Sequence, residues 1–466
     1  MKKITQLDNK ALFSNKQIFA ILIPLAIKNI LSICIGMVDS IMVSSVGEAA
    51  LAGVSLISSL DTFLITLFSA FSAGGSIVLS QYMGKKDREK SCDAAKQLLY
   101  LTVAIATFMV IVILPFRKLL LNLLFGDAEE IVMKYALDYF SIVAISFPFL
   151  AVNYALGAVL NAAGDSMTSL KISLFMNGLN ISGNALFIYA LSMEAAGAAI
   201  ATLISRIIGA VLMIWILHNK NRDIYIEKLF HYRPDKNMIK SVLQIGIPHG
   251  IESSLFQFGR LMTSSLISTL STASIAANAA SISIANFQYT AGGAIQSTLV
   301  IVVGRCIGAR DKKQAKHYSK LLLGMGWILI FVVASAICLF SSPLLSLFNL
   351  SEESFEIAKN LLFYHSAVSI AIWAIAFCLP SAFRAASDVN FTMVVSVFSM
   401  WVFRVALAYL MAWNEISIFG IFTISGFGLG IMGVWIAMTI DWVFRTILFL
   451  WRYLSGRWLK KCKNAD

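Results

Sequence analysis

Apolar segments long enough to cross a bilayer as helices recur along the whole chain. A transmembrane helix needs about 20 largely apolar residues, whereas a strand of a membrane barrel alternates apolar and polar positions over about ten. The apolar runs here are unbroken and show no such alternation. Because lipid offers no partner to a backbone amide, these runs predict helices. We expect twelve membrane spans, at residues 17–43, 51–82, 93–115, 132–158, 167–190, 195–217, 238–269, 275–304, 317–341, 355–382, 390–412 and 429–452.

The polar segments between these spans differ in charge on the two sides of the predicted membrane. One set is basic and contains KKDREK, RCIGARDKKQAK and SGRWLKKCK, whereas the tips of the other set carry Asp and Glu and no Lys or Arg. The positive-inside rule therefore predicts that both termini lie in the cytoplasm, with the protein in an inner or plasma membrane. Residues 1–16 contain no small-residue cleavage site, so we expect the first span to serve also as the insertion signal.

The composition agrees with an all-α polytopic membrane protein. Of the 466 residues, 58% are hydrophobic and only 13% are charged, whereas soluble domains carry about 25% charged residues. The net charge of +12 falls in the loops, where it sets orientation and meets anionic lipid, so it does not predict a nucleic-acid partner. The six cysteines are scattered without CxxC or Cys/His spacing. We therefore expect neither a metal or disulfide framework nor a cofactor.

Short motifs of the first half of the sequence recur in the second half, at a nearly constant offset in residue number. QYMGKKD at 81–87 returns as RCIGARD at 305–311, NAAGDS at 161–166 returns as RAASDV at 384–389, and Pro24 returns as Pro248. GAAIAT at 197–202 returns as GVWIAM at 433–438, at a longer offset because the segment IFGIFTISGFG is inserted in the second half. Four pairs in one order predict an internal duplication.

Each repeat holds six spans, and an even number of spans returns the chain to the same side of the membrane. The two halves should then be related by an axis along the membrane normal, with a central cavity between two rigid bundles. We expect an N-terminal lobe at 1–217, a cytoplasmic linker at 218–237, a C-terminal lobe at 238–454 and a basic tail at 455–466. This organisation favours transport by alternating access.

The order of motifs VDSIMVSSVG, SQYMGKKD, NAAGDS, GIPHGIESS, GRCIGARD and RAASD resembles the multidrug and toxic compound extrusion (MATE) family over essentially the whole chain. The resemblance implies a V-shaped, monomeric secondary antiporter with twelve helices. It also implies export of organic cations and other drugs, driven by inward Na⁺ or H⁺. The expected partners are a small amphipathic or cationic substrate and membrane lipid.

Asp39 is the first candidate for a functional site, because a carboxylate within a membrane helix is costly unless it meets a cavity, a partner or an ion. The alternative is an Asp at the helix end, at the level of the lipid headgroups. Asn180 and Asn184 lie four residues apart on one helical face, and a polar site with Asp39 in the same half is favoured over interhelical hydrogen bonds. The resemblance makes Asp39 the coupling carboxylate.

The same resemblance extends the coupling site to Asn180, Asn184 and Thr202, and assigns Asn153 to the polar position of the fourth helix. At Asn184 the family pattern has an Asp, so this chain has one carboxylate fewer. Asp39 could carry a proton. Alternatively, its oxygens and those of Asn180, Asn184 and Thr202 could form the oxygen shell that Na⁺ prefers. The sequence does not separate these two ions.

A second candidate site, for substrate, lies in the seventh span around Glu252, Gln257 and Arg260. Glu252 and Arg260 are eight residues apart and nearly in line on a helix, so a self-neutralising pair is as good an interpretation as a cation site. Gln288 and Tyr289 in the eighth span are further candidates for the cavity wall. Asp441 and Arg445, four residues apart, are expected to form a structural pair.

Other classes of membrane protein fit less well. The sequence has no P-loop for an ATP-driven pump and no His pair or GxSxG turn for a membrane-embedded enzyme. A passive channel remains open, although matched halves with buried carboxylates suit alternating access better. The nearest alternative is a flippase for lipid-linked saccharides, but the basic residues that would hold a diphosphate in the N-terminal half number only two, Lys28 and Arg206.

Overall fold

The computed structural model describes residues 11–126, 128–227, 233–418 and 422–463. Contacts divide them into two compact units. One unit is Phe13–Gly250, called the first unit below, and the second unit comprises the residues from Ile251 onward together with those before Phe13. The lobe boundaries that the repeat predicts, with a linker at 218–237, stay a prediction.

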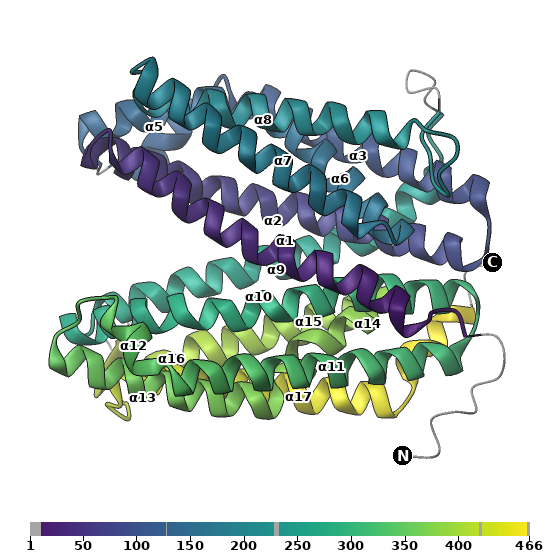
Figure 1. The fold of residues 1–466 in the computed structure, drawn as a ribbon. Helices are drawn as coiled ribbons and strands as arrows, with labels where there is room; N and C mark the ends of the chain where they lie inside the picture. The colour runs from purple at the N-terminus through teal and green to yellow at the C-terminus, as the bar shows by residue number, and fades with distance from the viewer. Residues whose placement is uncertain (1–10, 127, 228–232, 419–421, 464–466) are drawn as a thin grey trace. The chain divides into compact units, whose positions relative to one another are not determined.

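The first unit contains eight α-helices, one π-helical segment and the beginning of a ninth α-helix that continues into the second unit. Figure 1 shows the helices of this unit running lengthwise beside one another, with α7 packed along α8. The elements are α1 (Asn15–Ser44), α2 (Glu48–Gly84), α3 (Arg88–Ile113), α4 (Arg117–Phe125), α5 (Glu130–Ile145), α6 (Phe147–Ala163), α7 (Ser166–Asn184), η1 (Ala185–Ala190), α8 (Glu194–Leu217) and α9 (Lys236–Ser268).

The second unit is also helical apart from one short hairpin. Its elements are α10 (Thr272–Gly308), α11 (Lys312–Leu339), α12 (Ser341–Ser346), α13 (Glu352–Val368), η2 (Ser369–Cys378), α14 (Leu379–Ala385), α15 (Val389–Ser399), η3 (Met400–Ala406), α16 (Leu407–Ala412), β1 (Glu415–Ile418), β2 (Phe422–Ser425), α17 (Gly430–Leu454) and η4 (Arg457–Lys463). Strands β1 and β2 pair antiparallel in the segment that lengthens the second repeat.

The helices match the predicted membrane spans. Nine helices among the described residues are long and apolar enough to cross a membrane, or ten when α5 and α6 count as one span bent by 50°. The other two predicted spans, 167–190 and 238–269, are helical as α7 with η1 and as α9, but their polar side chains keep them below that standard of composition. The predicted all-helical fold is confirmed.

The repeat is also visible in the backbone conformation. Lys86 and Arg310, which occupy matching positions in the two repeats, both adopt φ of 60°, which closes the preceding helix in the left-handed region. The next residues, Asp87 and Asp311, cap the following helices by accepting hydrogen bonds from backbone N–H groups three residues on, at 3.0 and 2.9 Å. Since a left-handed residue followed by an Asp cap makes a tight corner, the short motifs encode the same turn twice.

A second corner, at the repeated NAAGDS and RAASDV motifs, carries an ion pair in each unit. Asp165 accepts from Arg222 Nη1 at 2.5 Å and from the Thr168 backbone N–H at 3.1 Å. Asp388 pairs with Arg452 Nε at 2.9 Å and is more deeply buried. Burial alone would raise the pKa of Asp165, but the hydrogen bonds from Thr168 and Arg222 outweigh it and hold this pKa below its usual value.

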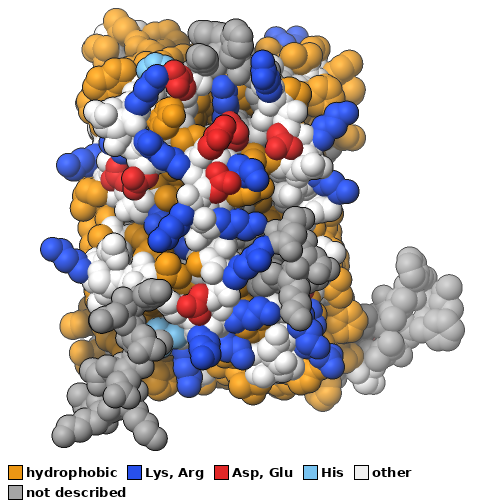
Figure 2. All heavy atoms as spheres, turned by 90° about the vertical axis from the view of Figure 1, so that its right-hand side faces the viewer, with side chains coloured by type: hydrophobic (Ala, Val, Ile, Leu, Met, Phe, Trp, Pro, Cys, Tyr) orange, Lys and Arg blue, Asp and Glu red, His pale blue; other side chains and the backbone are white. Residues whose placement is uncertain are grey.

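Lys and Arg side chains gather on the face that Figure 2 turns toward the viewer. On this face, the ends of the helices of the first unit hold the α2–α3 corner, with Lys85 and Arg88, and the segment after α8, with Lys220 and Arg222. In the second unit they hold the α10–α11 corner and the segment after α17. The basic loops that the sequence analysis placed on one side of a membrane therefore lie at one end of each unit.

Candidate functional site

The structure brings together four of the five residues predicted to couple ion movement, within the first unit. Asn184 Nδ2 donates to Asp39 Oδ1 at 2.8 Å, joining α7 to α1. Asn180 Nδ2 donates to Thr202 Oγ1 at 3.2 Å, joining α7 to α8. The two asparagines are buried and Asp39 is half-buried. Helical periodicity placed Asn180 and Asn184 on one face, and that face meets α1 and α8.

The neighbours of the Asn180 amide decide which way round it lies in this cluster. With its oxygen toward the Asp39 carboxylate, two acceptors would oppose each other. With its oxygen and nitrogen exchanged, the nitrogen donates to Asp39 Oδ1 at 2.8 Å and Oδ2 at 3.2 Å, while the oxygen accepts from Thr202 Oγ1 at 3.2 Å. Since amide orientations are assigned from such networks, the exchanged form, in which both polar atoms of Asn180 have complementary partners, is the one that this cluster favours.

Oxygen atoms dominate what this cluster offers to a ligand. The Asn184 Oδ1 atom is buried and has no hydrogen-bond partner among the described residues. With the Asp39 carboxylate, it provides the hard oxygen ligands that suit Na⁺. These oxygen ligands therefore suit a small hard cation, and the Asp39 carboxylate alone could bind a proton.

Asn153 and Lys28 lie outside this cluster. Asn153 Nδ2 donates to the Arg206 backbone oxygen at 3.0 Å, so this asparagine ties α6 to α8. Lys28 Nζ donates to Ser169 Oγ at 3.2 Å, on the neighbouring helix α7. Neither side chain has a described contact with Asp39.

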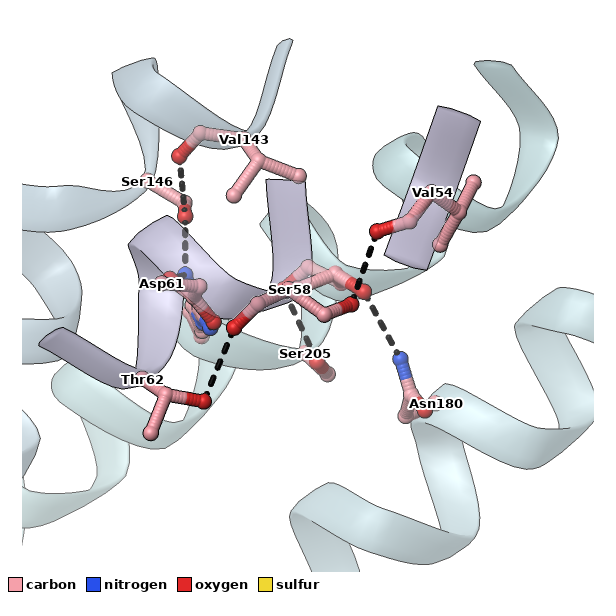
Figure 3. Close-up of polar contacts among 10 residues, drawn as sticks. Val54, Ser58, Asp61, Thr62, Val143, Ser146, Asn180 and Ser205 are labelled. Atoms are coloured by element: carbon pink, nitrogen blue, oxygen red, sulfur yellow. Dashed lines mark hydrogen bonds and ion pairs between the residues drawn. The ribbon is translucent and has the colours of Figure 1, made fainter. Parts of the chain in front are cut away.

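The sequence analysis missed a buried ion pair beside this cluster. Arg206 Nη2 lies 2.7 Å from Asp61 Oδ2, and Arg206 Nη1 donates to Ser146 Oγ at 2.8 Å. Figure 3 shows Asp61 and Ser146 close together, with Ser146 at the break between α5 and α6. The available signal was a second carboxylate within a predicted span, Asp61 in 51–82, which by the argument applied to Asp39 requires a partner.

The predicted substrate residues of the second unit separate into different environments. Glu252 pairs with Arg384 Nη2 at 3.2 Å, so its partner is not Arg260, eight residues along the same helix. Gln288 is buried and donates to Ser366 Oγ at 3.2 Å. Arg260 and Tyr289 line one cavity. Their proposed role in substrate binding stays a prediction.

Six of the fifteen residues that line that cavity are aromatic, and the cavity has a volume of about 270 Å³. Its rim and walls come from α9, α10, η2, η3 and α17 of the second unit. Tyr289 Oη lies 2.8 Å from His365 Nε2, and the His365 ring makes edge contacts with Trp435 and Trp442. His365 therefore has the structural surroundings that a lone buried histidine usually has.

The predicted pair of Asp441 and Arg445 is present, and a further arginine joins it. Arg445 Nε donates to Asp441 Oδ1 at 2.7 Å, and Arg404 Nη1 lies 3.8 Å from Asp441 Oδ2. Ser399 also donates to the same carboxylate. The Phe256 ring has the guanidinium carbons of Arg404 and Arg445 at 5.5 and 5.4 Å. This network holds two arginines on a single buried carboxylate.

Long apolar helices, a duplicated six-span pattern and polar side chains clustered inside each unit define a polytopic membrane transporter. The MatE family model matches the chain twice, at residues 24–186 and 248–410. The two matches begin at Pro24 and Pro248, the two prolines of the predicted repeat. The chain belongs to the MatE family, whose members are transporters and not enzymes.

Individual relatives agree with this membership. The chain is 25% identical to the uncharacterized transporter YisQ of Bacillus subtilis over 95% of both sequences. It is 24% identical to the probable multidrug resistance protein NorM of Thermotoga maritima, over 96% of this chain and 93% of that protein. A solved structure described as MATE in the bent conformation superimposes with a TM-score of 0.86 at 21% identity, covering 96% of each chain. That likeness shows the fold.

Proposed function

We propose that this transporter is a secondary antiporter that exports organic cations and other small amphipathic drugs in exchange for inward Na⁺ or H⁺. The multidrug resistance name of the Thermotoga maritima relative supports the export role. Alternating access between the two six-span lobes, 1–217 and 238–454, in a V-shaped molecule with a central cavity would carry the substrate across. In this proposal the protein acts as a monomer and needs no cofactor.

The observation that carries the proposal is the cluster of Asp39, Asn180, Asn184 and Thr202. Asn184 donates an N–H to the Asp39 carboxylate at 2.8 Å, and the Asn180 amide can donate to it at the same distance, so the charged carboxylate ties α7 to α1. Arrival of a proton or Na⁺ at Asp39 would weaken these hydrogen bonds, because the ion then competes with the amide N–H groups for the carboxylate oxygens. Ion occupancy can thereby change how α7 is held against α1 and α8.

Asn153 would contribute indirectly, by fixing the backbone of α8 close to Thr202. The basic end of each unit supports an orientation with both termini in the cytoplasm of a plasma or inner membrane, in contact with anionic lipid. A lipid-linked saccharide flippase is less well supported, because Arg206 in the first unit is neutralised by Asp61 and leaves Lys28 as the other intramembrane cation.

The proposal is tested by efflux of a fluorescent organic cation from proteoliposomes, with a Na⁺ gradient and a pH gradient imposed separately. We expect one of the gradients to drive transport and Asp39→Asn to abolish it. Asp223→Asn, which removes an exposed carboxylate from the segment after α8, outside the predicted spans, should leave transport unchanged. Normal transport by Asp39→Asn under both gradients would exclude Asp39 as the coupling group. Absence of cation transport under either gradient would exclude the export role itself.

A further inference from the structure

The aromatic cavity of the second unit carries excess positive charge. Arg260 and Arg404 both line it. Arg445 pairs with Asp441, the carboxylate that also lies near Arg404. Asp441 pairs with Arg445, accepts a hydrogen bond from Ser399 and lies 3.8 Å from Arg404. Its single negative charge cannot neutralise both Arg404 and Arg445. Among the described residues that line the cavity there is no Asp or Glu. The Arg404 side chain is only 13% exposed, whereas Arg260 is exposed. Since incompletely paired charge within a membrane is costly, the excess at Arg404 favours an anionic ligand, which Arg260 could also contact.

Hydrogen-bond donors also outnumber free acceptors on the cavity wall. The Trp442 indole N–H is buried and has no acceptor among the described residues. The Trp435 indole N–H donates to Asn278 Oδ1 at 3.1 Å. The amide N–H groups of Asn278 therefore remain available to donate to a ligand. An unmet buried donor beside two guanidinium groups favours a ligand that accepts hydrogen bonds.

The flat walls indicate the shape of the ligand. The Trp373 ring stacks on Tyr289, with centroids 6.1 Å apart and planes at 15°, and on Phe377, at 5.2 Å and 28°. Such stacked faces bind planar rings well. A volume of about 270 Å³ lies near the lower limit of roughly 300 Å³ for small-molecule sites, so the cavity suits a compact ligand better than a lipid-linked saccharide.

The repeat places this cavity at the counterpart of the Asp39 cluster. At the offset that takes Pro24 to Pro248, Asp39 corresponds to Thr263, which lines the cavity. At the longer offset that takes GAAIAT to GVWIAM, Thr202 corresponds to Met438, which lines it as well. The duplicated position has therefore lost its acid, and the guanidinium groups of Arg260 and Arg404 lie in the same cavity.

We propose that the second unit contains a binding site for a small organic anion with a planar aromatic body, such as an aromatic carboxylate or sulfonate. The acidic group is held by Arg260 and Arg404, and the ring packs on Trp373 and Tyr289. This site goes beyond the export function proposed above, because its ligand has the opposite charge to the expected drugs. It also does not depend on which ion drives transport.

The test is calorimetric titration of the purified full-length protein in phosphatidylcholine nanodiscs, with empty nanodiscs as the reference for partition into lipid. Three probes of the same ring system are compared: 2-naphthoate, 2-naphthylmethanol and 2-naphthylmethylammonium. We expect saturable binding of one 2-naphthoate per chain, weaker binding of the alcohol and no saturable binding of the ammonium compound. Equal binding of the anion and the ammonium compound would overturn the proposal.

Two variants separate the charge from the shape of the site. Arg260→Gln should weaken 2-naphthoate binding by at least about tenfold, because it removes a charge-assisted hydrogen bond. Ile282→Trp fills the cavity without changing its charge and should abolish binding. Arg457→Gln, an exposed arginine of the same unit outside the cavity, is the matched control. Unchanged affinity in both cavity variants would refute the site, and because binding is measured, this failure is distinct from a failure of transport.

Discussion

Replacing Asp61 with Asn should destabilise the first unit more than any exposed charge change in it. Arg206 loses a carboxylate at 2.7 Å and keeps Ser146 Oγ at 2.8 Å as a neutral acceptor. The two side chains are only 18% and 10% exposed, for Asp61 and Arg206 respectively. Removing one partner of a buried pair costs about 3–5 kcal/mol, because the other charge stays buried. We take about 3 kcal/mol, because Asp61 keeps some contact with water.

A unit of this size loses about 2–4 °C in midpoint temperature per kcal/mol, so Asp61→Asn should lower the midpoint by about 6–12 °C. The measurement is the fraction of monodisperse protein that survives heating in detergent, followed by size-exclusion chromatography. The double variant Asp61→Asn, Arg206→Met removes both charges and should recover most of the loss. Asp223→Asn, in the exposed segment after α8, serves as the control, with an expected effect within about 0.5 kcal/mol.

Either of two results would refute this prediction. If Asp61→Asn shifts the midpoint no more than Asp223→Asn does, the ion pair does not stabilise the unit. If the double variant is no more stable than Asp61→Asn alone, the loss does not come from an uncompensated Arg206. Either outcome would reduce the pair to an incidental contact.

Three further predictions concern the second unit and the repeated corners, each checked by thermal midpoints in the same assay. In Gly292→Ala the new Cβ would lie 1.9 Å from Trp373 Cη2, so stability should fall by about 1–3 kcal/mol and 2-naphthoate binding should weaken as the cavity wall moves. Asp388→Asn should cost several times more than Asp165→Asn, because the side chains are 2% and 35% exposed and exposed pairs contribute only about 0.2–1 kcal/mol. The pKa of Asp165 is lowered in the folded state, so its pairing with Arg222 stabilises the protein fully above about pH 4 and is lost as the pH falls through that lowered pKa. The thermal midpoints of Asp165→Asn and the wild type should therefore converge in acid.

Local features of the fold were predictable from the sequence because their causes are local. The spans follow from apolar length, and the corners at Asp87 and Asp311 follow from a short motif that forms a left-handed turn and a helix cap wherever it occurs. The pairing of Asn180 and Asn184 on one face likewise needs only helical periodicity. Each of these inferences involves residues close in the sequence.

Partners distant in the sequence were less predictable. Periodicity along one helix put Arg260 in line with Glu252, yet the structure pairs Glu252 with Arg384, far along the chain on α14. The same limit explains why Asp61 and Arg206 were not paired, although both lay within predicted spans. Likewise, the sequence contains many aromatic residues, and only the packing of five elements selects those that wall the cavity. Which face of a helix meets which neighbour is a property of the tertiary fold.

The duplication has kept the backbone and exchanged the charges. The corners at Lys86 and Arg310 repeat the same left-handed backbone conformation, whereas the polar positions inside the units do not repeat in kind. At the offset that takes Pro24 to Pro248, Lys28 corresponds to Glu252, a basic residue against an acidic one. At the same offset the carboxylate of Asp39 corresponds to the hydroxyl of Thr263.

Selection for a stable fold alone does not explain these differences in charge between matching positions. The same corners could form with apolar residues at every position inside the units. A buried charge is costly and is retained where it binds something. The acid-bearing cluster suits a proton or a small cation, and the arginine-lined cavity suits an anion. If both proposed sites are correct, the two units have diverged toward ligands of opposite charge within one repeated scaffold. Exchanging Arg260 for Glu should then shift the cavity's preference from 2-naphthoate toward 2-naphthylmethylammonium. If Arg260→Glu keeps the preference for the anion, the charge of the lining does not set the selectivity and this account of the divergence is wrong.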